Sequence, residues 1–382
     1  MPTSPGVLSL QALNRALLAR QLLLAPAPMP DAGAGNEAAR AQRVIETVEH
    51  LVGLQAQAPF PPYYGLWSRL AGFRPDDLAG LILSRQVVRI ALMRGTIHLV
   101  SARDCLTLRP LVQPALERGL SLLSRQLAGV DTSALAAAGR VLVEERPLTF
   151  SELGAALSPQ WPQHPPAALA QAVRALVPLV QVPPRAVWGA AGQAAHTSAQ
   201  AWLGLQMADR PSLERLVTRY LAAFGPASVQ DAQAWSGLTR LREVVDRLRP
   251  GLRAFRDEQG TELFDLPGAP RPEPDTPAPV RLVAEFDNLI LSHADRARII
   301  SEPNRQRMFT RNGIFPGTVL VGGFVAGMWK LTRSRAAAAL AIELFQPLRP
   351  RDRDAVTGEG GRLLAFAAPD APAHDIRFAP LA

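Results

Sequence analysis

The chain has very little cysteine and no long apolar run. Cys105 is the single cysteine among 382 residues, which excludes an internal disulfide framework and any cysteine-rich zinc site. Polar residues such as Gln11 and Arg15 interrupt the apolar face of residues 1–24, so that segment does not match a secretory signal. No run approaches the roughly 18 apolar residues of a membrane span. We therefore expect a reduced, cytoplasmic protein with no membrane partner.

Histidine and lysine are scarce as well. The six histidines are scattered without the spacing of a metal site, so we expect no metal and no cofactor. Lys330 is the only lysine, although Lys+Arg totals 41 against 33 Asp+Glu, for a net charge of +8. Arginine forms planar, forked hydrogen bonds that suit phosphate groups and guanine edges. A GC-rich genome that replaces lysine by arginine explains the same composition, so the charge gives a polyanionic partner only weak support.

Two glutamines follow the second predicted helix. Helical spacing is seen from Ser9 onward and again over residues 38–52, where it stops at Gly53. Gln55 and Gln57 come next, and prolines at positions 59, 61 and 62 prevent a long helix from continuing. The two glutamines are therefore predicted at a helix exit or short turn, where side chains can be aimed at a ligand. The alternative is that they only cap the helix end.

Three segments follow the order helix, turn, helix, wing, which is that of winged-helix modules. In the first, β-rich residues 87–93 and 96–100 are separated by Arg94-Gly95. In the second, residues 180–189 are the candidate wing, and in the third a hairpin is predicted around residues 257–260. We expect modules at 1–130, 131–205 and 206–268.

The character of the chain changes after the proline-rich residues 269–279. Residues 280–382 are predicted to form a β-rich, barrel-like unit. The expected strands are 280–284, 307–310, 318–324, 327–332 and 363–366, with a helix at 335–345. Together with the modules, this predicts an α+β fold.

Four short stretches occur in a set order along the chain. They are residues 54–59 with the nearby Trp67, then 94–100, 225–238 and 285–296. Each alone is a weak motif, but the ordered set resembles the AlkZ/YcaQ-type winged-helix DNA glycosylases. The resemblance spans about residues 9–332, which is most of the chain.

The resemblance implies tandem winged-helix motifs in a C-shaped arrangement around duplex DNA, with a β-barrel. It also implies a catalytic pair of polar residues separated by one apolar residue, which matches Gln55 and Gln57, although Ala56 is small for the middle position. The Gln–Gln form is similar to the AlkZ branch, linked to removal of bulky alkyl adducts and crosslinks. The implied protein is a monomeric DNA glycosylase acting on alkylated purines, in base excision repair or self-resistance.

A glutamine amide cannot act as a general base near neutral pH, and the substrate class explains why none is needed. An N7-alkylated guanine is cationic, so it departs as a neutral base without protonation. The enzyme then has to stabilise an oxocarbenium-like sugar and place a water, which amide oxygens can do. We assign water positioning to Gln57, and to Gln55 either binding of the deoxyribose or holding of that water. Neutral lesions such as uracil should be poor substrates.

The same segment bears on the mechanism class and on nearby aromatic residues. No lysine lies near the pair to form a Schiff base, because Lys330 is far along the chain, which favours a monofunctional glycosylase. Tyr63, Tyr64 and Trp67 follow the pair, and they either wall off an extruded nucleotide or pack in the core.

Several further residues are candidate DNA contacts, each with a structural alternative. His98 is either a DNA contact or a buried structural residue, and His293 belongs either to a phosphate-binding loop or to an internal hydrogen-bond network. The arginines of residues 296–311 either follow phosphates or form a solvated basic face. The candidates are Arg94, Thr96, His98, His293, Arg296, Arg305, Arg307 and Arg311.

A different function class also fits winged-helix modules. A non-enzymatic DNA-binding protein, such as a transcription regulator, would prefer one DNA sequence and leave the DNA intact. Regulators usually carry a dimerisation element, and we see no heptad-like zipper in the chain. Three dispersed modules suit the wrapping of a duplex better.

Overall fold

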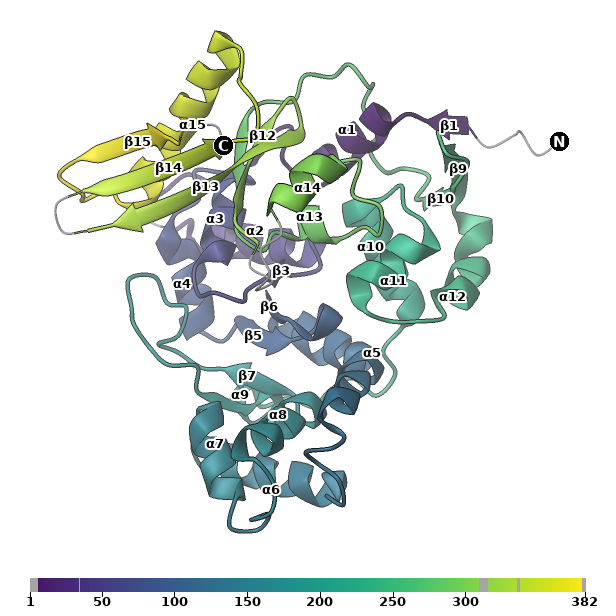
Figure 1. The fold of residues 1–382 in the computed structure, drawn as a ribbon, viewed down its shortest axis with the longest axis vertical. Coiled ribbons are helices and arrows are strands. Elements are labelled where there is room, and N and C mark those ends of the chain that lie inside the picture. Colours follow the sequence, from purple (N-terminus) through teal and green to yellow (C-terminus); the bar gives the residue numbers. More distant parts are fainter. Residues whose placement is uncertain (1–5, 34, 309–314, 335–336, 380–382) are drawn as a thin grey trace.

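The computed structural model describes residues 6–33, 35–308, 315–334 and 337–379. Figure 1 shows a central region of helices and short strands, with a helical lobe below it, a group of helices at the right and a sheet at the upper left. The expected α+β class is confirmed. Arg311, a candidate DNA contact, lies outside the described residues.

The N-terminal elements form around local sequence signals. The Ser9 side chain accepts a hydrogen bond from the amide of Ala12 and so caps the first helix, while prolines occupy the first turn of the third and fourth helices. The elements are β1 (Gly6–Leu8), α1 (Leu10–Arg20), β2 (Ala27–Pro28), α2 (Glu37–His50), β3 (Leu54–Gln55), α3 (Pro61–Trp67), β4 (Leu70–Ala71) and α4 (Pro75–Leu83).

A five-stranded sheet in the order β3-β6-β5-β7-β8 lies at the centre. The expected strands on either side of Arg94-Gly95 are confirmed as an antiparallel pair joined by the short 3-10 turn η1. Strands β7 and β8 extend this sheet across β5, and only the first residues of the segment 180–189, where a second wing was expected, are strand. The elements are β5 (Val87–Ala91), η1 (Met93–Gly95), β6 (Ile97–Ser101), β7 (Leu179–Gln181) and β8 (His196–Ser198).

Two groups of helices flank the centre. The lower lobe in Figure 1 encloses an apolar cluster of its own, and the right-hand group packs beside α1. The lower lobe and its connection are α5 (Ala102–Leu120), η2 (Ser121–Leu123), α6 (Thr132–Glu145), α7 (Phe150–Leu157), α8 (Pro166–Leu176) and α9 (Ala199–Leu203). The right-hand group is α10 (Leu213–Phe224), α11 (Val229–Ser236), α12 (Leu241–Leu248), η3 (Arg249–Gly251), β9 (Arg253–Asp257) and β10 (Glu262–Asp265).

The C-terminal part is an open sheet rather than the expected barrel-like unit. Its strands follow the order β11-β12-β13-β14-β15, and in the described part of the chain β11 and β15 are not paired with each other. Helix α15 contacts β11, β12, β14 and β15. The elements are β11 (Arg281–Val283), α13 (Asn288–Leu291), α14 (Glu302–Met308), β12 (Gly317–Val321), β13 (Phe324–Arg333), β14 (Ala338–Leu344), α15 (Pro350–Ala367) and β15 (His374–Phe378).

Three sequence expectations in this part are wrong. The helix expected at 335–345 is strand β14 over its described residues, because burial alternates along Ala338, Leu340 and Ile342 and pairing with β13 and β15 outweighs the helix preference of alanine. Residues 363–366 lie in helix α15 rather than in a closing strand. Arg307 lies in helix α14 rather than in a strand at 307–310, of which 309–310 are outside the described residues.

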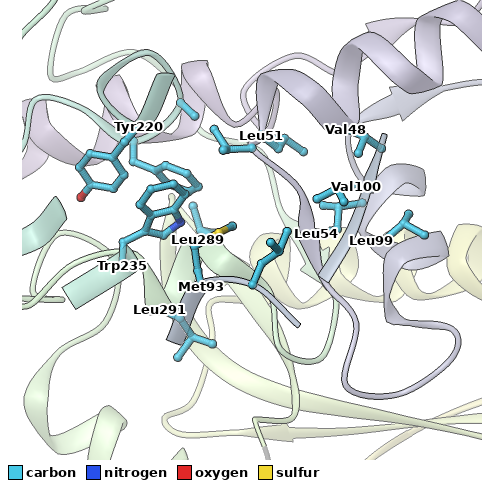
Figure 2. Packing of buried hydrophobic residues seen from close by; sticks show 14 of the residues in the cluster. Val48, Leu51, Leu54, Met93, Leu99, Val100, Tyr220, Trp235, Leu289 and Leu291 are labelled. Carbon is cyan, nitrogen blue, oxygen red and sulfur yellow. The ribbon is translucent and has the colours of Figure 1, made fainter. Parts of the chain in front are cut away.

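One apolar core joins distant parts of the chain behind the glutamine motif. Figure 2 shows Leu54 beside Leu99 and Val100, with Leu289 and Trp235 on the other side of it. These residues come from the N-terminal region, from α11 and from α13. The core therefore ties the segments that surround residues 54–57 to one another, since burial of each apolar surface depends on the others.

Candidate functional site

Gly53 directs the chain from α2 into the short strand β3. Its φ of +90° is in the left-handed region, and a Cβ at this position would lie 2.6 Å from a methyl group of Val100. Glycine is therefore required for this close approach. Strand β3 then pairs with the edge of β6, with Leu54 opposite Leu99 and Gln55 opposite His98. Gln55 thus lies in a short strand, and Gln57 in the bend that follows it, just beyond the helix exit at which both were expected.

The two glutamine amides bond to the turn and strand that follow β5, not to the end of α2. Gln55 is buried, and its Oε1 accepts a hydrogen bond from Arg94 Nη2 at 2.7 Å. Gln57 is exposed, and its Oε1 accepts from the backbone N–H of Ile97 at 2.9 Å. An amide NH₂ group cannot accept either bond, so these donors determine the orientation of both amides. Helix capping, the alternative interpretation, does not describe these contacts.

Arg89 holds the backbone on both sides of Gln57. This buried side chain of β5 donates from Nη2 to the Ala56 carbonyl at 2.7 Å and from Nη1 to the carbonyls of Ala58 and Pro59, both at 3.2 Å. Burial, with a contribution from Arg185, lowers the pKa of Arg89 to about 10. The Arg89 guanidinium therefore holds residues 56–59 in place through hydrogen bonds to uncharged carbonyl oxygens. Sequence reasoning missed this residue; its only signal was an arginine within the apolar strand Val87–Ala91.

Arg94 connects Gln55 to two distant segments. It lies in the η1 turn with a positive φ of 57°, and it donates from Nη1 to the Trp235 carbonyl at 2.5 Å and from Nη2 to Asn288 Oδ1 at 2.9 Å. Burial, together with the neighbouring Arg296, lowers the pKa of Arg94 to about 10. Asn288, which sequence reasoning also missed, lies in the stretch 285–296. Arg94 is therefore engaged inside the protein rather than extended into solvent.

Two of the candidate DNA contacts are buried histidines. His98 is fully buried and donates from Nδ1 to the Thr96 carbonyl at 3.0 Å, and burial lowers its pKa to about 3. His293 is also buried and donates from Nε2 to the Phe224 carbonyl at 3.0 Å, next to the Asp231 carboxylate. Neither imidazole reaches the surface in this structure, and the buried position of His98 matches its structural alternative. The internal network is the arrangement found for His293.

The remaining candidates lie nearer the surface. Thr96 is half-buried and its hydroxyl donates to the Met93 carbonyl. Arg296 and Arg305 line one cavity of about 260 Å³ together with Glu302, which forms a bidentate ion pair with Arg305 at 2.5 and 2.6 Å. Arg307 donates to the carbonyl of Phe345 at 2.8 Å. The structure thus brings Arg296 close to both Arg94 and Arg305, while the ion pair offsets part of the positive charge.

Of the aromatic residues after the motif, Tyr63 and Tyr64 pack against Trp188, whereas Trp67 is half-buried and lines a cavity with Phe366. Tyr63 is fully buried and its hydroxyl donates to the Ala186 carbonyl at 2.7 Å. The ring of Trp188, from the segment between β7 and β8, lies 4.8 Å from that of Tyr63, 5.9 Å from that of Tyr64 and 5.4 Å from that of Phe60. Core packing, one of the two alternatives, is thus the arrangement found for Tyr63 and Tyr64, and Trp188 joins the motif segment to the central sheet.

Three buried histidines predict a loss of stability in mild acid. Burial lowers the pKa of His98 to about 3, that of His196 to about 4, and that of His293 as well, against about 6.5 in the unfolded chain. Between these values the unfolded chain binds more protons, so the free energy of unfolding falls as the pH drops below about 6.5. Each histidine contributes at most about 1.4 kcal/mol per pH unit. Denaturant titrations at pH 7.5, 6 and 5 measure this, and equal free energies at pH 7.5 and 5 would contradict it.

The described residues show neither a membrane-spanning helix nor a metal-binding cluster. No helix among them is long and apolar enough to cross a membrane. Within the same residues, no three His, Cys, Asp or Glu side chains gather so as to hold a metal ion.

Comparisons with known proteins agree with the resemblance in the sequence. The family model for AlkZ-like DNA glycosylases matches residues 48–366, which is most of the chain. The solved structure of the Streptomyces sahachiroi DNA glycosylase AlkZ superposes with a TM-score of 0.76 at 16% sequence identity, covering 98% of this chain and 100% of that one. No curated protein matches. The chain therefore belongs to the AlkZ-like DNA glycosylase family and is an enzyme of that class.

Proposed function

We propose that this glycosylase hydrolyses the N-glycosidic bond of N7-alkylated purines in duplex DNA, with Gln55 and Gln57 as its catalytic residues. The observation that carries the proposal is the pair of glutamine amides, each held in one orientation by a protein donor. Preorganised dipoles of this kind stabilise a developing charge without having to rearrange during the reaction. The products are the free alkylated base and an abasic site.

The chemistry of a cationic base matches the groups at the motif. The departing base is neutral, so the site needs no proton donor, and the nearby imidazole of His98 is buried with its pKa lowered to about 3. Gln57 is exposed, and its Oε1 has a second lone pair beside the bond from Ile97, which suits the positioning of an attacking water. Water bound there attacks the anomeric carbon as the bond to the base breaks; the electron pair of that bond leaves with the now neutral base, and the water proton passes to solvent. Lys330, the only lysine of the chain, lies in β13. The proposed nucleophile is water rather than a lysine amine, so we infer that the enzyme is monofunctional.

The DNA-binding architecture is part of the same proposal. We infer winged-helix modules at 1–130, 131–205 and 206–268 that enclose a duplex, with η1 and the adjacent strands forming the tip of the first. Phosphate contacts are proposed for Arg296 and Arg305, which share a cavity, and for Arg307 and Arg311. We propose that the enzyme acts as a monomer in the cytoplasm, in base excision repair or in self-resistance, on bulky adducts or crosslinks.

Release of the base from a defined lesion tests the substrate class. Duplex DNA containing 7-methylguanine is incubated with the enzyme and the free base is measured by chromatography, in parallel with a duplex containing uracil. We expect release of 7-methylguanine and at least about 100-fold slower release of uracil, because uracil departs as an anion that needs further stabilisation. Equal rates on the two lesions would overturn the proposed substrate class. Sequence-specific footprints with no base release from any lesion would instead favour the regulator alternative.

A further inference from the structure

The hydrogen bond from Arg94 determines which end of the Gln55 amide faces outward. Guanidinium Nη2 is a donor only, so it can meet Oε1 of the amide but not its NH₂ group. Turning the amide by 180° would place two donors against each other and leave the half-buried guanidinium without this acceptor. The loss of a hydrogen-bond partner costs more free energy for a charged group than for a neutral one. The amide NH₂ of Gln55 therefore points away from Arg94, and within the described chain no residue accepts a hydrogen bond from it.

Arg94 is itself held by groups that come from far along the chain. Its Nη1 donates to the Trp235 carbonyl at the end of α11, and its Nη2 donates to both Asn288 Oδ1 and Gln55 Oε1. Asn288 begins α13 next to Asp287, which forms a bidentate pair with the buried Arg69. The side chain that orients Gln55 is thus fixed by two segments that do not belong to the motif.

The cost of this arrangement argues against a purely structural role for Arg94. Its hydrogen-bond partners in the described chain are a carbonyl and two amide oxygens, none of which carries a negative charge. Arg94 is half-buried, so its charge gives up part of its hydration for neutral partners, a cost that an apolar side chain of the same volume would not carry. Charged groups perturbed in this way cluster at functional sites.

We propose that Arg94 is a positioning residue that makes Gln55 a hydrogen-bond donor toward bound DNA. The Nε2 of Gln55 then meets an oxygen acceptor of the target nucleotide, while its Oε1 stays on Arg94. This inference rests on the proposed catalytic role of Gln55 and changes its chemistry, because the amide acts through its NH₂ group rather than as an acceptor for sugar or water.

A Gln55→Glu variant separates the two chemistries. The carboxylate keeps an oxygen on Arg94 and supplies a counter-ion, but it removes the NH₂ group. We expect it to excise 7-methylguanine as slowly as Gln55→Ala does, in single-turnover assays with saturating enzyme. Excision at or above the wild-type rate by Gln55→Glu would overturn the donor role. Because this variant should fold at least as stably as the wild type, thermal unfolding serves as its control.

A double-mutant cycle tests whether Arg94 acts through Gln55. Arg94→Met should slow excision roughly 10-fold, the equivalent of one hydrogen bond, with the Kd for DNA changed less than twofold. In the Gln55→Ala background the same change should have no further effect, and Arg94→Lys should restore part of the rate. If the rate losses of Arg94→Met and Gln55→Ala multiply in the double variant, or if Arg94→Met changes only the Kd for DNA, then Arg94 contacts DNA directly. Either result would overturn the positioning role. If Gln55→Ala itself excises at the wild-type rate, the catalytic assignment under the proposed function fails instead.

Discussion

Replacing Gln57 by alanine is expected to slow excision of 7-methylguanine from duplex DNA by about 100-fold, the loss seen when one preorganised catalytic group is removed. Gln57 is exposed, and its amide is oriented by the backbone N–H of Ile97. Without it the attacking water is no longer held against the sugar, although the cationic base still leaves readily. Single-turnover rates at saturating enzyme measure the effect, with DNA affinity determined separately by fluorescence anisotropy.

The matched control for this variant is Gln160→Ala. Gln160 is an exposed glutamine that follows α7 in the helical lobe. Its replacement by alanine therefore removes the same kind of side chain at a position outside the motif. It should excise at the wild-type rate. Because Gln57 is exposed and contributes one hydrogen bond to the fold, both variants should unfold within about 1 kcal/mol of the wild type. A Gln57→Ala enzyme with unchanged excision would exclude Gln57 from the reaction.

The second large effect is expected on stability, at the ion pair beside Asn288. Asp287 accepts from both Nη atoms of Arg69, at 2.8 and 2.9 Å, and it also caps α13 through the amide of Leu289. Both side chains are almost fully buried, at 0% and 3% exposure. Asp287→Ala leaves the Arg69 cation buried without its carboxylate, so we expect the free energy of unfolding to fall by about 3–5 kcal/mol. Denaturant titration at pH 7.5 measures the change.

An exposed ion pair gives the control for Asp287. Glu214 and Arg247 are 39% and 57% exposed and lie 2.7 Å apart, so Glu214→Gln should lower the free energy of unfolding by less than about 1 kcal/mol. Similar losses of unfolding free energy in Glu214→Gln and Asp287→Ala would contradict the claim that burial makes the Asp287 ion pair the more important one. If Asp287→Ala folds at low temperature, its excision should also be slowed, since Asn288 helps to hold Arg94.

The local features of the fold could be predicted from the sequence because neighbouring residues determine them. The helix expected from Ser9 onward is α1, which the Ser9 side chain caps through the amide three residues away. The strands around Arg94-Gly95 and the end of α2 before Gln55 follow from glycine, proline and β-branched residues in the same short segments. The expectation failed at 338–344, where alanine-rich residues form a strand because of their partners in β13 and β15.

The candidate site depends on contacts that no local pattern contains. The sequence by itself determined the family, through four ordered stretches, and it placed Gln55 and Gln57 just beyond a helix. Only the tertiary structure decided how their amides face, because the donor to Gln55 is 39 residues away and Asn288, which helps to fix that donor, is another 194 residues along. It also decided that His98 and His293 are buried and that Arg89 clamps the motif loop. The physical reason is that burial and hydrogen-bond partners arise from packing between distant segments, whereas the sequence pattern records only which residues are available.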